Sequence, residues 1–204
     1  MEAGIEGGIH TINLLWEEHS QEEDWGFILI DARNESNKEN RTAMLSTVQH
    51  EWPSVTQFTF NCYRHWAILV VREMGDRSGH FLHSKEGVTQ LDPLAIIAYG
   101  IGVPPLIREI RGAHPHVTQT WYADDTGAGV NFSHILAHLW DLQARGPQRG
   151  YFPDPTKSIL VVAPRNIARV EGFFIGMELK VVTRAGILES SSGRERRSKV
   201  AVWA

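Results

Sequence analysis

The sequence predicts an α+β fold built on an antiparallel sheet. Short apolar runs that suit strands lie at residues 26–30, 67–72 and 158–163. Helical patterns separate them irregularly, and turn residues that suit hairpins join several of them. With 42% hydrophobic and 22% charged residues over a length of 204, one compact domain with a substantial core is expected.

Residues 9–23 have apolar side chains at three-to-four spacing and acidic ones elsewhere, which predicts an amphipathic helix. The period then changes at residues 26–30, a buried strand that ends directly before Asp31. A helix is predicted from residue 37, with Asn37 as its N-cap, and Pro53 prevents it from continuing beyond Trp52.

A strand pair is predicted at 67–72 and 79–83, joined by a turn rich in Gly, Asp and Ser. Asp92-Pro93 is typical of a helix start and opens an apolar helix to residue 101, which Gly102 and Pro104 interrupt. A further short helix is expected at 106–111. Residues 117–122 alternate as a strand and lead into a hairpin.

In the last third, Ser133 is a candidate N-cap for a helix that ends at Gly146. Strands are predicted at 158–163 and 179–183. We expect residues 189–204, which are rich in Ser and Arg, to form a disordered basic tail after a folded part at 1–188.

Composition excludes several classes of protein. No apolar run approaches the roughly 20 residues of a membrane helix, and the acidic start does not resemble a signal peptide. The single cysteine, Cys62, suits a reducing compartment or a small buried apolar position. We expect an intracellular protein, nuclear or cytoplasmic, that is neither secreted nor bound to a membrane.

Charge is distributed unevenly around a net value of −4. Residues 1–40 hold ten acidic and two basic side chains, and the remainder holds 14 acidic and 18 basic ones. An acidic leading segment before a mildly basic body is compatible with a polyanion bound on one face only.

Three carboxylates stand at the ends of predicted strands: Asp31, Asp124 and Asp125. Carboxylates at the edge of an apolar sheet lose hydration and repel each other, and a divalent cation would compensate their charge. If the two strands are neighbours, Asp31 and Asp124 could share a pair of Mg²⁺ ions, which need few protein ligands because they retain waters. The alternative is that Asp-Asp-Thr-Gly is an ordinary turn sequence.

Four motifs in order carry a resemblance to a known family. Tyr122-Ala123-Asp124-Asp125 matches the Tyr-x-Asp-Asp motif of reverse transcriptases. Residues 29–34 around Asp31 resemble that family's first palm motif, 87–94 around Gln90 the second, and 155–158 around Lys157 a later lysine-bearing one. The match runs over roughly residues 1–185 and is most similar to reverse transcriptases of non-LTR retroelements.

The resemblance implies the palm of an RNA-directed DNA polymerase, with helices packed on one face of its sheet, partial fingers and no thumb. By similarity, Asp31 and Asp124 would ligate two Mg²⁺ ions, or Mn²⁺, for nucleotidyl transfer to a primer 3′-hydroxyl, with Asp125 assisting. Lys157 would donate a proton to the leaving group, unless it is an ordinary exposed lysine.

The family's substrates and nucleotide contacts follow from the same resemblance. Gln90 would contact the template-primer or the incoming nucleotide, and Tyr122 would lie under the primer end. Ala32, Arg33 and Ser36 would lie in the nucleotide site. The implied partners are an RNA template, a DNA primer and deoxynucleoside triphosphates, with other chains as a source of fingers and thumb.

Two residues depart from the family pattern. Ser36 stands where a bulky aromatic side chain normally excludes a ribose 2′-hydroxyl, and Leu91 replaces a glycine directly after Gln90. Much of the fingers and the whole thumb are expected to be absent, so we do not expect processive synthesis by this chain alone. The alternatives are an inactive nucleic-acid-binding remnant and a folded interaction module whose acids serve only as turn residues.

Other motifs have competing explanations. His134 and His138, with His114 and His116, make a zinc site conceivable, but solvated or hydrogen-bonded histidines are the simpler alternative. Three tryptophans could stack on bases, although their spacing favours core positions: Trp52, Trp66 and Trp140. The sequence contains no P-loop motif, and Gly127-x-Gly129 lacks the third glycine of a dinucleotide fold.

Overall fold

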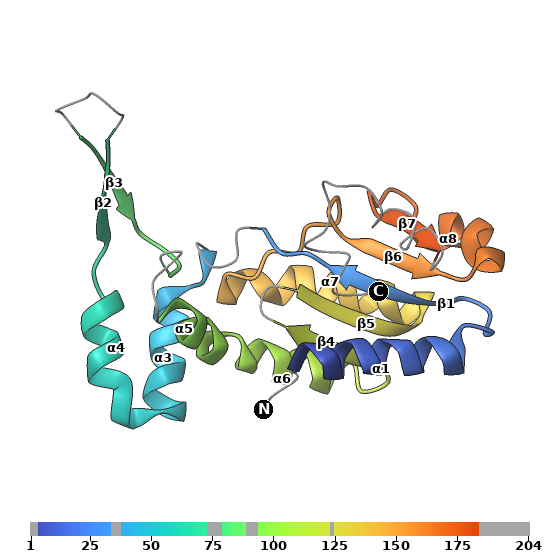
Figure 1. The fold of residues 1–204 in the computed structure, drawn as a ribbon, viewed down its shortest axis with the longest axis horizontal. Helices are drawn as coiled ribbons and strands as arrows, with labels where there is room; N and C mark the ends of the chain where they lie inside the picture. The colour runs from blue at the N-terminus through green and yellow to red at the C-terminus, as the bar shows by residue number, and fades with distance from the viewer. Residues whose placement is uncertain (1–3, 34–37, 73–78, 89–93, 123–124, 184–204) are drawn as a thin grey trace. The chain divides into compact units, whose positions relative to one another are not determined.

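The computed structural model describes residues 4–33, 38–72, 79–88, 94–122 and 125–183 (Figure 1). The fold is α+β, as predicted, with a five-stranded sheet and a separate two-stranded sheet. The chain divides into two compact units. The first comprises residues 1–32, 110–143 and 153–204, and the second comprises 33–109 and 144–152. The predicted boundary at residue 188 and the basic tail lie outside the described residues.

The first unit contains the five-stranded sheet, in the order β4-β5-β1-β6-β7. Its strands are β1 (Trp25–Ile30), β4 (Thr118–Tyr122), β5 (Asp125–Asn131), β6 (Ile159–Val162) and β7 (Lys180–Thr183). The central strand β1 pairs antiparallel with both β5 and β6. The predicted antiparallel sheet is confirmed for the pairs β4–β5, β5–β1 and β1–β6, whereas β7 runs parallel to β6. A parallel pair requires a crossover, which η3 (Pro164–Asn166) and α8 (Ile167–Phe173) supply.

Helices cover both faces of β1, so the expectation of helices on one face is wrong for this strand. On one face, Trp25 and Phe27 pack against side chains of α1 (Gly4–His19), namely Ile12, Leu15 and Trp16. On the other face, Gly26 lies against Phe132, the first residue of α7 (Phe132–Arg145). The physical reason is that β1 is a continuous apolar run, which needs cover on both sides. Helix α7 begins at Phe132, so Ser133 is already its second residue, and the predicted N-cap at Ser133 is wrong.

Gly127 and Gly129 of β5 make room for the ring of Phe27 on the neighbouring strand. Phe27 pairs with Gly129, and Leu29 pairs with Gly127. A Cβ atom at Gly127 would lie 2.5 Å from the Phe27 ring, and one at Gly129 would lie 2.9 Å from it. The Gly-x-Gly pattern thus serves packing within the sheet.

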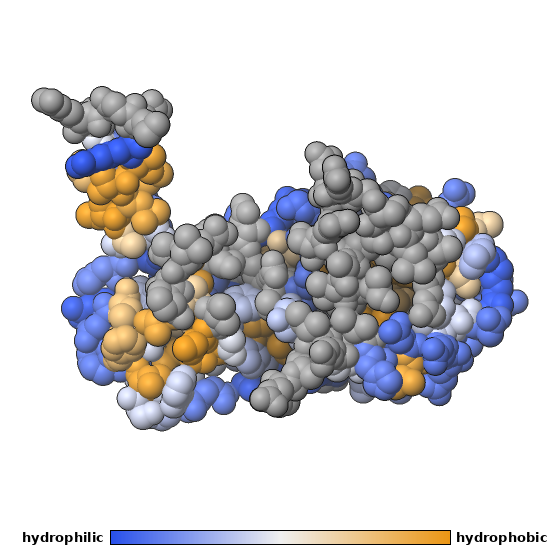
Figure 2. Space-filling model, in the orientation of Figure 1, coloured by the Kyte–Doolittle hydropathy of each residue, from blue (hydrophilic) through white to orange (hydrophobic). Residues whose placement is uncertain are grey.

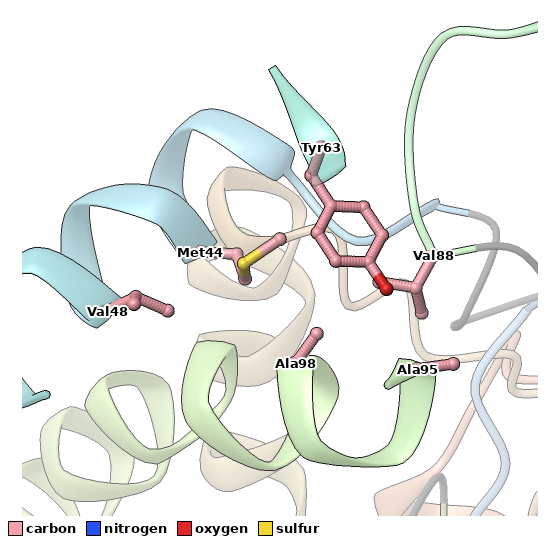
Figure 3. Close-up of a cluster of buried hydrophobic side chains, with 6 residues drawn as sticks. All are labelled: Met44, Val48, Tyr63, Val88, Ala95 and Ala98. Carbon is pink, nitrogen blue, oxygen red and sulfur yellow. The ribbon is translucent and has the colours of Figure 1, made fainter. Parts of the chain in front are cut away.

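The second unit is largely helical. Besides the hairpin described below, its described elements are α3 (Arg41–Glu51), η1 (Pro53–Val55), α4 (Thr56–Tyr63), α5 (Ala95–Gly102) and η2 (Gly146–Arg149), with the first residues of α6 (Pro104–Ala113). Its core joins α3, α4, α5 and the chain at residue 88 (Figure 3), through Met44, Val48, Tyr63, Val88, Ala95 and Ala98. Tyr63 lies between Met44 and Val88 in this cluster (Figure 3).

Helix boundaries in the second unit differ from the sequence prediction. The N-cap of α3 is Asn40, whose Oδ1 accepts a hydrogen bond from the N–H of Ala43 at 3.0 Å. The predicted cap, Asn37, and the predicted Asp92-Pro93 helix start lie outside the described residues. Pro53 ends α3, but it also begins η1, from which the unpredicted helix α4 follows. Pro104 likewise opens α6, because proline is tolerated in the first turn of a helix.

A hairpin of β2 (Ala67–Val71) and β3 (His80–Ser84) forms the two-stranded sheet, close to the predicted ranges. Figure 2 shows hydrophobic surface gathered over it, and its exposed apolar side chains include Ile68, Val70 and Phe81. The predicted core positions of Trp52, Trp66 and Trp140 are wrong, because these residues are 44%, 60% and 56% exposed. Cys62 is also exposed and free. No helix in the described ranges combines the length and apolar character that crossing a membrane requires.

A candidate metal centre at the ends of two paired strands

Asp31 and Asp125 lie at the same end of two neighbouring strands. Asp31 directly follows β1, Asp125 opens β5, and Ile30 pairs with Thr126 as the last residues of the β1–β5 ladder. One further step in this register would set Asp31 opposite Asp125. Residues directly opposite in antiparallel strands have Cβ atoms about 4.5–5.5 Å apart. The strands at 26–30 and 117–122, whose neighbourhood is the condition for a shared cation site, are not adjacent, because β5 lies between β1 and β4. It is the second strand of the hairpin, β5, that brings Asp125 beside β1, and both Asp31 and Asp125 are partly buried.

The hairpin that carries Asp125 is also present. Tyr122 pairs with Asp125, and the two residues between them, Ala123 and Asp124, lie outside the described residues. The buried Thr126 anchors the start of β5, because its Oγ1 donates a hydrogen bond to the Thr120 carbonyl at 3.0 Å. Tyr122 ends β4 with about half of its surface exposed.

A turn at residues 154–158 holds the main chain of Asp31. The Asp31 N–H donates to Ser158 Oγ at 3.3 Å, and the Asp31 carbonyl accepts from the Asp154 N–H at 2.8 Å. The Ser158 hydroxyl in turn donates to the Asp154 carbonyl at 2.8 Å. Sequence reasoning missed both residues. The available signal was Asp154 between two prolines with Thr156 two residues later, which is typical of an Asx turn.

The other predicted site residues are placed as follows. Lys157 lies in the same turn with an exposed side chain, and its N–H donates to the Asp154 carbonyl at 3.1 Å. Ala32 is buried and forms a β-bridge with Pro153. Arg33 is exposed. Ser36, Gln90 and Leu91 lie outside the described residues, so their roles stay predictions.

The donor set at this end of the sheet fits a hard divalent cation in part. Carboxylate oxygens are the ligands that Mg²⁺ prefers, and Asp31 and Asp125 supply two such groups. Within the described ranges, no group of three or more His, Cys, Asp or Glu side chains is arranged to hold a metal ion. The third predicted ligand, Asp124, lies outside those ranges. The ligand set therefore stays a prediction.

Arg41 is a second feature that sequence reasoning missed. Its side chain is 7% exposed and makes three hydrogen bonds within the second unit. It donates to the Gly87 carbonyl at 2.6 Å, to the His65 carbonyl at 3.1 Å and to Ser84 Oγ at 3.1 Å. Arg41 thus joins both ends of the β2–β3 hairpin to the segment that leads toward Gln90. The signal was its helical spacing from Met44 and Val48, which puts Arg41 on the buried face of α3.

Glu39 is a buried carboxylate in the same unit. It is 2% exposed, and neither carboxylate oxygen has a hydrogen-bond partner. Burial raises the pKa of Glu39 from 4.5 to about 7. A Cβ atom on Gly102 would collide with the Glu39 carboxylate, so glycine is required at that close approach.

The four histidines considered for a zinc site form two ring contacts in the first unit. The His114 and His138 ring centroids are 5.5 Å apart, and those of His116 and His134 are 6.4 Å apart. His138 is fully buried without a hydrogen bond to either ring nitrogen, so the solvated or hydrogen-bonded alternative is wrong for it. The pKa of His138 is lowered from 6.5 to about 4, mainly by burial and in addition by His114, while Asp141 acts in the opposite direction. No zinc-type cluster occurs in the part of the chain that is described.

Comparison with models of protein families gives no match, and no curated protein matches the sequence. Solved structures do match. Apo telomerase from Candida tropicalis aligns with a TM-score of 0.60 at 12% identity, covering 78% of this chain and 32% of that one. The same telomerase truncated from its C-terminal domain gives 0.60 at 14% identity, covering 78% and 35%. The complex with a TWJ fragment of telomeric RNA gives 0.56 at 13%, covering 76% and 28%.

The chain shares its fold with part of telomerase. Telomerase is related to reverse transcriptases, so a reverse-transcriptase-like fold agrees with the ordered motifs of the sequence. The chain spans about a third of the telomerase chains that it matches. Identities this low establish the fold alone.

Proposed function

We propose that the chain is the palm, with part of the fingers, of an RNA-directed DNA polymerase of the non-LTR retroelement type. The observation that carries this proposal is the placement of Asp31 and Asp125 at the same end of the paired strands β1 and β5. The telomerase-like fold supports it. In this proposal, residues 1–188 form the folded part and residues 189–204 a basic tail.

In the proposed reaction, Asp31, Asp124 and Asp125 hold two Mg²⁺ ions, or Mn²⁺. When bound, such ions activate a primer 3′-hydroxyl and offset the charge of the departing pyrophosphate. Lys157 supplies a proton to that leaving group from the turn that also contacts the Asp31 main chain. The partly buried setting of Asp31 and Asp125 strengthens their attraction for cations relative to fully solvated carboxylates.

The proposed substrates are an RNA template, a DNA primer and deoxynucleoside triphosphates. One matching telomerase was solved with a fragment of telomeric RNA, which supports a nucleic-acid partner. Tyr122, exposed at the end of β4, is suitably accessible to support a primer end. Ala32, Arg33, Ser36 and Gln90 complete the proposed nucleotide and template site, with other chains as a source of fingers and thumb.

Primer extension on a primed RNA template tests the proposal. The full chain is compared with Asp31→Asn and Asp124→Asn, which keep the side-chain size but remove the charge. We expect each substitution to lower product formation by at least 100-fold at saturating Mg²⁺. Glu171→Gln is the matched control, because Glu171 is an exposed acid on α8. Equal product from wild type and both aspartate variants would refute catalysis by these residues.

Two sequence observations favour a second candidate, an inactive nucleic-acid-binding remnant: Ser36 replaces the family's aromatic residue, and Leu91 replaces its glycine. This candidate predicts binding of primer-template without synthesis. Because phosphate contacts release counterions, its affinity should fall steeply as salt is raised from 50 to 200 mM. Binding that is insensitive to salt would exclude it.

A further inference from the structure

The strand that delivers Asp31 is paired with an irregular partner. Leu29 pairs with Ile159, and Ala32 forms the next bridge with Pro153. Two residues on one side, Ile30 and Asp31, therefore face the five residues 154–158 on the other. Extra residues in one strand form a bulge, and such bulges occur beside active sites because they re-aim a side chain.

Asp154 accepts most of the hydrogen bonds within the bulge. Its carbonyl accepts from the Ser158 hydroxyl and from the N–H groups of Lys157 and Ser158. Its Oδ1 accepts from the N–H of Thr156 at 3.2 Å and from the Thr156 hydroxyl at 2.7 Å. Asp154 is nearly buried and Ser158 fully so, which protects these bonds from competition with water.

Both main-chain groups of Asp31 end on this bulge. Its N–H donates to Ser158 Oγ, and its carbonyl accepts from the Asp154 N–H. Ser158 is therefore a relay, since one hydroxyl accepts from Asp31 and donates to Asp154. These two hydrogen bonds hold the main chain of Asp31 on both sides of its Cα.

We infer that Ser158 and Asp154 are positioning residues that set the Asp31 carboxylate for cation binding. This inference rests on the proposed function, because it concerns what Asp31 does there. Hydrogen-bond partners behind a metal ligand typically alter metal affinity 10- to 100-fold when they are removed. Lys157 lies in the same turn, so the hydrogen bonds of this turn hold the main chain at both Asp31 and Lys157.

The test uses the full chain and three variants with one control. Ser158→Ala removes the relay hydroxyl, and Asp154→Ala removes the acceptor of the turn. Asp154→Asn keeps an Oδ1 acceptor for Thr156 and should behave as wild type. Ser133→Ala is the matched serine control, because Ser133 is exposed on α7. The readouts are amide hydrogen exchange without metal, Mn²⁺ binding by calorimetry, and kcat and KM in primer extension.

We expect Ser158→Ala and Asp154→Ala to raise the exchange rate of the main-chain amides at positions 31 and 154, which hold Asp31 to the turn, at least 10-fold, with Phe27 unchanged. Mn²⁺ affinity should fall about 10-fold, and kcat should fall while KM for the nucleotide stays constant. Saturating Mn²⁺ should restore part of the rate. Because metal binding also stabilises a folded chain, the unchanged exchange at Phe27 without metal is what distinguishes these variants from merely unstable ones.

If Ser158→Ala does not fold, Thr156→Val takes its place, because it weakens the turn from its more accessible side without leaving a buried cavity. If the wild-type chain binds Mn²⁺ and the variants show unchanged exchange at Asp31 or unchanged Mn²⁺ affinity, the positioning role alone is overturned. A wild-type chain that binds no Mn²⁺ overturns the proposed function and the positioning role with it.

Discussion

Glu39 is a carboxylic acid that lies almost fully buried, with no hydrogen-bond partner for either side-chain oxygen. A carboxylate without hydrogen-bond partners is costly to bury in its charged form, and burial raises its pKa from 4.5 to about 7. Because the folded-state pKa lies above the unfolded one, folding takes up a proton between these values. The free energy of unfolding therefore falls as pH rises through this window, by on the order of 3 kcal/mol in total.

Glu39→Gln should remove this pH dependence. At or below pH 4.5 the variant and the wild type should have similar stability, because Glu39 is then neutral in the folded chain. At pH 8 the variant should be more stable by about 2–3 kcal/mol. Urea unfolding at both pH values measures the difference, with Glu171→Gln as an exposed control that should stay flat. A difference that does not change with pH would contradict the assignment.

The candidate site was predictable from sequence only where local pattern decided it. Asp31 follows an uninterrupted apolar run and Asp125 follows a hairpin signal, so both strand ends could be located. The partners that fix Asp31 could not, since Ser158 is 127 positions away in the chain. Hydrogen bonds over such separations depend on strand order, which periodicity does not encode.

At the scale of elements, β5 depends on the absence of side chains opposite Phe27. Gly127→Ala would place a methyl group 2.5 Å from the Phe27 ring within a paired strand, so it should lower the free energy of unfolding by about 1–3 kcal/mol. Gly112→Ala is the matched control, because nothing lies within 4 Å of that helical position. It should raise stability by about 0.5–1 kcal/mol. Thermal or urea unfolding of the two variants gives the comparison, and a neutral Gly127→Ala would contradict this packing.

The elements themselves were largely predictable, and the exceptions have physical causes. Prolines at 53 and 104 mark the end of one helix in the sequence, yet each also opens the next helical segment. Trp66 directly precedes the continuous apolar run Ala67–Val71, which is typical of a core strand, but it lies beside a hairpin that has no second layer in the described residues. Amphipathic patterns identify strands and helices, while burial depends on what the rest of the fold supplies.

At the scale of the whole molecule, each unit has a core made from its own residues. Met44→Ala should therefore destabilise the second unit by about 2–5 kcal/mol, because Met44 is buried in its central cluster. Hydrogen exchange should accelerate at Val48 and stay unchanged at Phe27 and Ile28. Ile135→Ala, in the first unit, should give the reverse pattern. Equal acceleration in both units would show that they unfold together.

The place of β1 in the middle of its sheet has a consequence for how the proposed site fails. Sheets under mild denaturing stress fray from their outer strands inward. The outer strands of this sheet are β4, which ends at Tyr122, and β7, which ends at Thr183. Asp31 instead follows β1, the central strand, which is paired on both sides. In a urea series followed by hydrogen exchange we expect the amides of β4 to lose protection before those of β1, and because Tyr122 pairs with Asp125, the hairpin end of the proposed site should loosen while Asp31 is still held.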